Sequence, residues 1–192
     1  SNVITIESAQ GKVINDPLNQ DIKRTVDGTL VGVTTKYFNA ANVETNGLDI
    51  ELNYAIITNT GLLNFGIKGT HILEYEIPDN NGSLKNVVGL FNHDNFARSL
   101  PETKIVLNTS LSNNNHTVAL YGRYVSDYST TRPLSALAKD AGFDQKIDQW
   151  ITFDLQYSYS FNLLGNDTRL SIGGNNILDE DVPIVYDAAN FS

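Results

Sequence analysis

Hydrophobic and polar residues alternate along most of the chain between residues 48 and 177. Successive side chains of a β-strand point to opposite faces, so this alternation predicts strands with one apolar and one polar face. In the clearest segment, 151–161, Ile, Phe, Leu, Tyr, Tyr and Phe alternate with Thr, Asp, Gln, Ser and Ser. A further short strand is predicted near Val3–Glu7. The six main segments are 48–56, 63–77, 104–112, 117–127, 151–161 and 169–177.

The connections between the predicted strands alternate between short and long. Tight turns rich in Asn and Gly are predicted at 58–61, 113–115 and 165–167. The connections at 8–36, 78–100, 129–149 and from 179 onward are long. This pattern sorts the long loops to one end of the sheet, as in membrane barrels with short turns on one side and long loops on the other.

One long connection carries a helix signal. The segment 134–141 is predicted to be a short helix, with Pro133 before its start and Gly142 as a left-handed cap after its end.

These patterns predict an all-β fold, an antiparallel meander of long strands. The alternation alone fits a soluble sandwich, where the apolar face packs on a second sheet, and a membrane barrel, where it contacts lipid. Long strands favour the barrel, and so do charged residues such as Asp49, Glu51, Arg123 and Asp154 on the polar stripes. Aromatic residues near the strand ends suit the two membrane interfaces. They are Tyr54, Tyr75, Tyr124, Tyr128, Trp150, Tyr159 and Phe161.

Composition narrows the function classes. The net charge of −9 argues against nucleic-acid binding. The chain has no Cys and no apolar run long enough for a transmembrane helix. The three histidines, His71, His93 and His116, are far apart, and no catalytic motif is present, so we expect neither an enzyme nor a cofactor. The acidic clusters are interpreted as solvated loop surfaces, and no metal site is predicted.

Three segments carry a family resemblance. Residues 37–54 begin with Tyr-Phe-Asn, contain Thr-Asn-Gly-Leu-Asp and end with Asn-Tyr. Residues 96–104 contain Arg-Ser-Leu-Pro. Residues 175–183 read Asn-Asn-Ile-Leu-Asp-Glu-Asp-Val-Pro. In this order and spacing they resemble the barrel of TonB-dependent outer-membrane receptors. The resemblance covers about Tyr37 to Tyr186.

The resemblance implies a 22-stranded transmembrane β-barrel with an N-terminal plug, energised through TonB. Residues 1–192 would be the C-terminal portion of this barrel, with the plug, its TonB box and the final strand outside the chain. The implied function is part of an outer-membrane active transporter for a siderophore, cobalamin or an oligosaccharide. Its partners would be TonB, acting through the plug, the extracellular nutrient and outer-membrane lipid. The alternative is a soluble secreted all-β carbohydrate-binding module.

Under the receptor interpretation, substrate contacts come from the long loops and the polar residues near them. The guanidinium groups of Arg98 and Arg132 are suited to a carboxylate or phosphate, although an inter-loop salt bridge or a lipopolysaccharide contact is the favoured alternative for both. The candidates are His93, Asp94, Arg98, Tyr128, Arg132 and Asp148.

Overall fold

The fold is described by a computed structural model that covers residues 3–6, 9–40, 43–78, 83–91 and 99–185. The described part of the chain is all-β, with two short helices, α1 (Ala9–Asn15) and α2 (Ala136–Asp140). This confirms the fold class predicted from the alternation.

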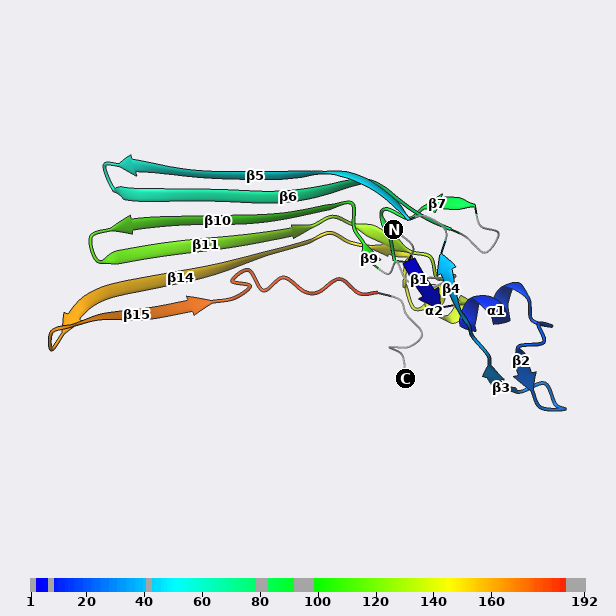
Figure 1. Cartoon of the computed structure of the whole chain (residues 1–192). Helices are drawn as coiled ribbons and strands as arrows, with labels where there is room; N and C mark the ends of the chain where they lie inside the picture. The colour runs from blue at the N-terminus through cyan, green and yellow to red at the C-terminus, as the bar shows by residue number, and fades with distance from the viewer. Residues whose placement is uncertain (1–2, 7–8, 41–42, 79–82, 92–98, 186–192) are drawn as a thin grey trace.

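Six long strands form one antiparallel meander, in which each strand pairs with the next long strand along the chain. All six predicted segments are strands, and the sixth begins and ends three residues before its predicted limits (Figure 1). A short strand, β7 (Leu84–Asn86), pairs with the end of β6. The long strands are β5 (Glu44–Thr58), β6 (Gly61–Pro78), β10 (Thr103–Asn113), β11 (His116–Val125), β14 (Trp150–Leu163) and β15 (Asn166–Gly174).

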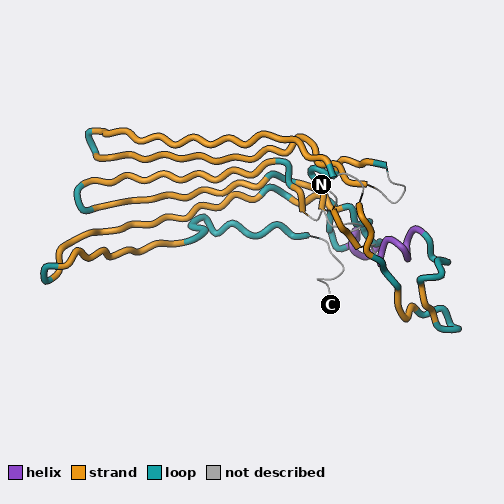
Figure 2. Tube along the Cα trace, viewed as in Figure 1, coloured by secondary structure: helices purple, strands orange, loops and turns teal. Residues whose placement is uncertain are grey.

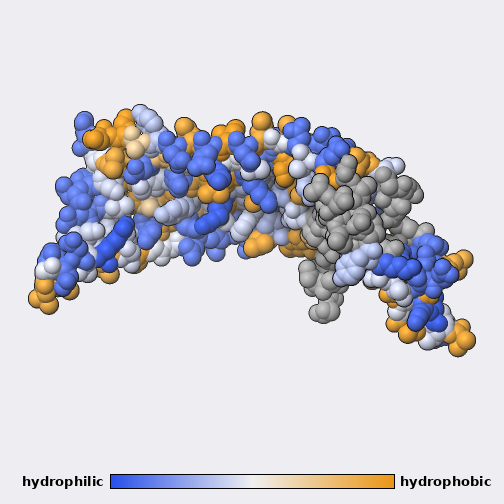
Figure 3. Space-filling view, viewed as in Figure 1, coloured by the Kyte–Doolittle hydropathy of each residue, from blue (hydrophilic) through white to orange (hydrophobic). Residues whose placement is uncertain are grey.

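The register merges the apolar stripes of the strands into one face. Leu52 lies opposite Ile67, and Ile67 lies opposite Leu107 on its other side. The row continues through Gly122 to Phe153. Directly opposed residues of antiparallel strands point to the same face, so the sheet has one apolar face and one mainly polar face. In the space-filling view, hydrophilic side chains cover most of the viewed sheet and hydrophobic ones project along its upper edge (Figure 3).

The apolar face is open to its surroundings. Val118 and Leu155, on the inner strands β11 and β14, are 44% and 41% exposed. On the outer strands β5 and β15, Leu52 is 53% exposed and Ile172 is 72% exposed. Within the described residues the six strands form a single layer, with no second sheet packed on the apolar side. Most of the hydrophobic side chains of the sheet therefore remain without a core.

Tight turns gather at one end of the sheet and long connections at the other (Figure 2). Asn59 and Thr60 join β5 to β6, and Asn114 and Asn115 join β10 to β11. The third turn lies slightly before its predicted place, at Leu164 and Gly165, whose φ angles are 52° and 85°. Two consecutive left-handed residues are what a two-residue type I′ hairpin requires.

The long connections fold together at the other end. They form a four-stranded sheet, which we call the loop layer, in the order β13 (Lys146–Ile147), β12 (Tyr128–Thr130), β8 (Leu90–Phe91) and β9 (Ser99–Leu100). Ile77 and Val87 are fully buried beside this sheet, against Val43, Tyr75, Leu90 and Leu100. The largest fully buried side chains of the described residues thus lie at this end, Ile77 at the end of β6 and Val87 just after β7.

Helix α2 is shorter than predicted. It begins after Ser135 rather than Pro133, because the Ser135 hydroxyl accepts a hydrogen bond from the Ala138 N–H at 3.1 Å and caps the first turn. Gly142 follows the helix with a φ of 82°, as predicted.

The N-terminal segment contains structure that the sequence pattern did not predict. The predicted first strand is β1 (Val3–Ile6), which pairs with β4 (Tyr37–Ala40). The connection expected at 8–36 holds α1 and a hairpin of β2 (Ile22–Arg24) and β3 (Leu30–Val33). No helix in the described part of the chain has the length and apolar character needed to cross a bilayer.

An ion pair fastens α1 to the start of this hairpin. Lys12 Nζ lies 2.8 Å from Asp21 Oδ2 and also donates to the Thr34 carbonyl at 3.1 Å. The hydrogen bond from Lys12 holds the pKa of the Asp21 carboxyl below its ordinary value.

Candidate functional site

The predicted loop candidates are divided between described and undescribed parts of the chain. His93, Asp94 and Arg98 lie outside the described residues. Tyr128, Arg132 and Asp148 all belong to the connection between β11 and β14.

The three described candidates are held in different ways. Tyr128 is half-buried in β12 and lies opposite Ile147. The carbonyl of Arg132 accepts a hydrogen bond from Gln145 Nε2 at 3.0 Å. The side chain of Asp148 is 83% exposed and lies 3.9 Å from Lys146 Nζ, which is 3.4 Å from Asp127. Asp148 thus belongs to an exposed cluster of charged side chains beside β13.

The polar face of the long sheet carries balanced charges. Arg123 Nη1 donates to Asp154 Oδ2 at 2.6 Å, and the Thr70 hydroxyl donates to Asp49 at 2.6 Å. Within the described strands, the register places four acidic and four basic residues on the middle and turn-end part of this face. They are Asp49, Glu51, Asp154 and Asp167, and Lys68, Lys104, Arg123 and Arg169. The acidic excess of the chain therefore lies elsewhere.

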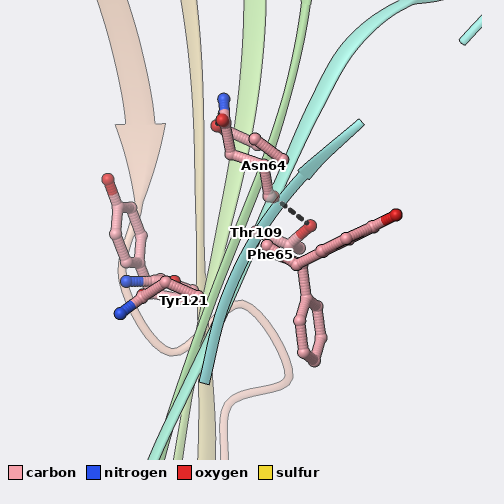
Figure 4. A pocket seen from close by; sticks show the side chains of 9 residues that line it. Asn64, Phe65, Thr109 and Tyr121 are labelled. Carbon is pink, nitrogen blue, oxygen red and sulfur yellow. Dashed lines mark hydrogen bonds between the residues drawn. The ribbon is translucent and has the colours of Figure 1, made fainter. Parts of the chain in front are cut away.

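A cavity of about 450 Å³ opens on the polar face, at mid-height of the sheet. Asn53, Gly66, Asn108 and Tyr121 form one row across four neighbouring strands. Figure 4 shows Tyr121 on one side of these strands and Phe65 on the other. The polar-face side chains that line the cavity are Asn53, Ala55, Asn64, Asn108, Ser110 and Tyr121. We call this the amide cavity.

Gly66 gives the amide cavity its shape. A Cβ at this position would lie 2.0 Å from Asn108 Oδ1 and 2.8 Å from Asn53 Oδ1. The absence of a side chain therefore lets two amide oxygens approach each other over the backbone of β6.

Hydrogen bonds inside the amide cavity leave some polar groups open. Asn64 Nδ2 donates to Ser110 Oγ at 3.4 Å, and Asn53 Nδ2 donates to Glu51 at 3.1 Å. The Thr109 hydroxyl donates to the Asn64 carbonyl at 3.1 Å (Figure 4). Among the described residues, the side-chain amide of Asn108 and the hydroxyl of Tyr121 have no hydrogen-bond partner, and both side chains are exposed. These two groups are available to a ligand.

A second cavity of about 460 Å³ adjoins the first beyond Tyr121. It contains the Arg123–Asp154 pair, and Asp154 Oδ1 also accepts from the Asn176 N–H at 2.9 Å. Asn176 and Glu180 exchange two hydrogen bonds of 3.0 Å, which close a turn. The segment 175–183, which carried part of the family resemblance, is thus anchored to β14 through Asp154.

The aromatic residues predicted near strand ends do not share one face. Tyr159 stacks with Phe161, with ring centroids 5.7 Å apart, on the apolar face near the tight turns. The His116 ring lies tilted against Tyr159, with centroids 4.8 Å apart. Trp150 lies on the polar face opposite Val125, and its Nε1 is buried without a partner among the described residues. Tyr128 belongs to β12 of the loop layer. Strand parity and the pairing of β12 with β13 thus separate Trp150 and Tyr128 from the aromatic residues of the apolar face.

Two histidines make local contacts. His71 lies on the apolar face, with Nδ1 2.8 Å from the Thr103 hydroxyl and Nε2 3.6 Å from Glu102. His116 is exposed beside the turn between β10 and β11, and its Nδ1 lies 2.6 Å from the Tyr157 hydroxyl. Within the described ranges, no group of three or more acidic or histidine side chains is arranged to hold a metal ion.

Comparisons of the chain with protein-family models, with curated proteins and with solved structures gave no match. The candidate site is therefore defined by geometry alone: a polar face with two adjoining cavities, backed by an exposed apolar face. The amide cavity had no sequence signal of its own, because its residues come from four strands and meet only through the register. The alternation of polar and apolar residues does place each residue of the amide cavity on the polar side of its strand, and this is its only indication of the site.

Proposed function

We propose that this chain forms part of the barrel wall of a TonB-dependent outer-membrane transporter that imports a large nutrient, such as a siderophore, cobalamin or an oligosaccharide. In this proposal the apolar face contacts lipid, the polar face lines the interior, and the folded loops lie on the extracellular side. TonB acts on the plug, and the loop candidates, including Arg132 and Asp148, contribute to substrate capture.

The observation that carries the proposal is the uncovered apolar face. Six antiparallel strands turn one continuous set of Leu, Ile, Phe and Tyr side chains outward, and Ile50, Leu52 and Ile172 are each more than half exposed. A soluble protein rarely leaves so large an apolar patch in water. Hydrocarbon is a favourable solvent for it, and alternation with a polar interior is characteristic of membrane strands.

The sorting of the connections gives independent support. Three tight turns lie at one end of the sheet, and the folded loop layer lies at the other. Outer-membrane barrels have this asymmetry, with short periplasmic turns and longer extracellular loops.

Adjacent positions of β5 provide the experiment. Leu52 points to the apolar face and Asn53 to the polar face, and both are exposed. We expect Leu52→Arg to weaken the association of the refolded chain with lipid vesicles, measured by flotation, because a cation at the bilayer midplane costs about 2–4 kcal/mol. Asn53→Arg is the matched control and is expected to float almost like the wild type.

The alternative, a soluble carbohydrate-binding module, predicts different results. It would give a monomer in solution at high concentration without detergent, no flotation, and equal behaviour of the two arginine variants. That set of results would refute the transporter proposal.

A further inference from the structure

The amide cavity contains unoccupied hydrogen-bonding groups of a particular kind. The Asn108 amide offers two donors and an acceptor, and the Tyr121 hydroxyl offers one donor and one acceptor. Both lie on the polar face, opposite each other on β10 and β11. A ligand that carries both donors and acceptors within a short distance can therefore use the full hydrogen-bonding capacity of these two groups.

We propose that the amide cavity is a binding site for a neutral, hydroxyl-rich ligand, namely a short oligosaccharide. Each sugar hydroxyl both donates and accepts, which matches the side-chain amides of Asn53, Asn64 and Asn108. The C–H face of a sugar ring is apolar, and the exposed ring of Tyr121 supplies a flat apolar surface for it.

Charge separates this ligand class from anionic ones. No ionised side chain lines the amide cavity. An anionic siderophore or a phosphate ester is recognised best by Arg or Lys in a forked geometry. The nearest guanidinium in the adjoining cavity, that of Arg123, is already paired with Asp154 at 2.6 Å.

The size of the amide cavity and its continuity with the second cavity also fit an oligosaccharide. A volume of about 450 Å³ lies within the range of about 300–1,000 Å³ typical of small-molecule sites. Tyr121 borders both cavities, so a chain of sugar units bound at the amide cavity has room to continue toward Gln156 and Ser171. The site depends only on the polar face, whereas its role as a step in nutrient uptake rests on the proposed function.

The test measures binding of three neutral hexasaccharides, maltohexaose, xylohexaose and mannohexaose, to the full chain. Titration calorimetry in a detergent without a sugar headgroup is suitable, with hexagalacturonate as the anionic probe. We expect at least one neutral probe to bind and hexagalacturonate to bind more weakly. Asn108→Ala and Tyr121→Ile are each expected to weaken binding about tenfold, equivalent to about 1.4 kcal/mol.

Matched variants separate binding from folding. Asn59→Ala removes an exposed asparagine in a turn, and Tyr124→Ile removes a tyrosine from the opposite face of β11. Both are expected to retain wild-type affinity. Circular dichroism of all four variants checks that the strands remain folded.

The proposal is overturned if none of the three neutral probes binds at millimolar concentration. It is also overturned if hexagalacturonate binds as tightly as they do, or if Asn108→Ala and Tyr121→Ile bind like their controls. If the sugar-binding test fails but the chain floats normally with vesicles, the transporter proposal remains intact. Binding without flotation would support the site and refute the membrane location.

Discussion

Arg123 and Asp154 form a 2.6 Å hydrogen-bonded ion pair between β11 and β14, and the same carboxylate accepts the Asn176 N–H at 2.9 Å. Asp154 is thus shared by a neighbouring strand and by the turn that follows β15. The side chain of Asp154 is 15% exposed and that of Arg123 is 51% exposed, so solvent screens the pair only in part.

A double-mutant cycle tests this shared carboxylate. We expect Asp154→Ala to destabilise the chain more than Arg123→Ala, because it also removes the acceptor for Asn176. A favourable coupling between the two side chains is expected from the cycle, measured by unfolding in detergent. Hydrogen exchange at the Asn176 amide is expected to accelerate in Asp154→Ala and to change little in Arg123→Ala. Equal exchange in both variants would contradict the anchoring role.

Two glycines of β6 are expected to respond differently to alanine. Gly61 has a φ of 134°, and a Cβ there would lie 2.2 Å from the Ser112 carbonyl oxygen, so Gly61→Ala is expected to cost about 1–3 kcal/mol. At Gly66 the closest atom is the end of the flexible Asn108 side chain, which can rotate away. Gly66→Ala is therefore expected to cost less. Thermal unfolding of both variants measures the difference in stability. A larger loss of stability in Gly66→Ala than in Gly61→Ala would show that the Asn108 side chain does not move aside.

The strands could be predicted from the sequence because side-chain direction in a strand is fixed by geometry. Ile151 and Phe153 identify one face of β14 whatever lies beside it. The register could not be predicted in the same way. Leu73 is an extra residue in β6 opposite Asn46 and Gly47, and this bulge shifts the pairing beyond it.

The site required contacts that local patterns do not contain. Asn53 and Asn108 meet over Gly66 only because β5 and β10 both pair with β6. The loop layer depends on the parallel pairing of Ser129 with Leu90, residues from two separate connections. The local sequence pattern therefore indicates charged loop residues as candidates, whereas the two cavities described above lie on the strands.

The pair of Lys12 and Asp21 predicts a local pH dependence. The pKa of Asp21 is lowered by its bond to Lys12, so the folded state holds the proton less tightly than the unfolded state, where an aspartate has a pKa of about 3.9. The stabilisation is complete above that unfolded value and is lost as the pH falls through the lower folded value. We expect amide exchange at Ile22 and Thr34, corrected for its intrinsic pH dependence, to show reduced protection at acid pH.

The control for this prediction is Lys12→Met, which keeps the aliphatic stem of the side chain and removes its charge. In this variant the loss of protection on acidification is expected to shrink markedly. The same loss in Lys12→Met and in the wild type would show that another group causes it.

Trp150 is the only tryptophan of the chain, and its place on the polar face gives an optical test of sidedness. Brominated acyl chains quench an indole only near contact, so its emission in brominated vesicles is expected to fall slightly. In a Trp150→Phe background, Leu52→Trp is expected to be quenched several times more strongly than Asn53→Trp, because the two positions point to opposite faces. Equal quenching at both positions would mean that lipid does not distinguish the two faces, and the apolar stripe would then need another partner.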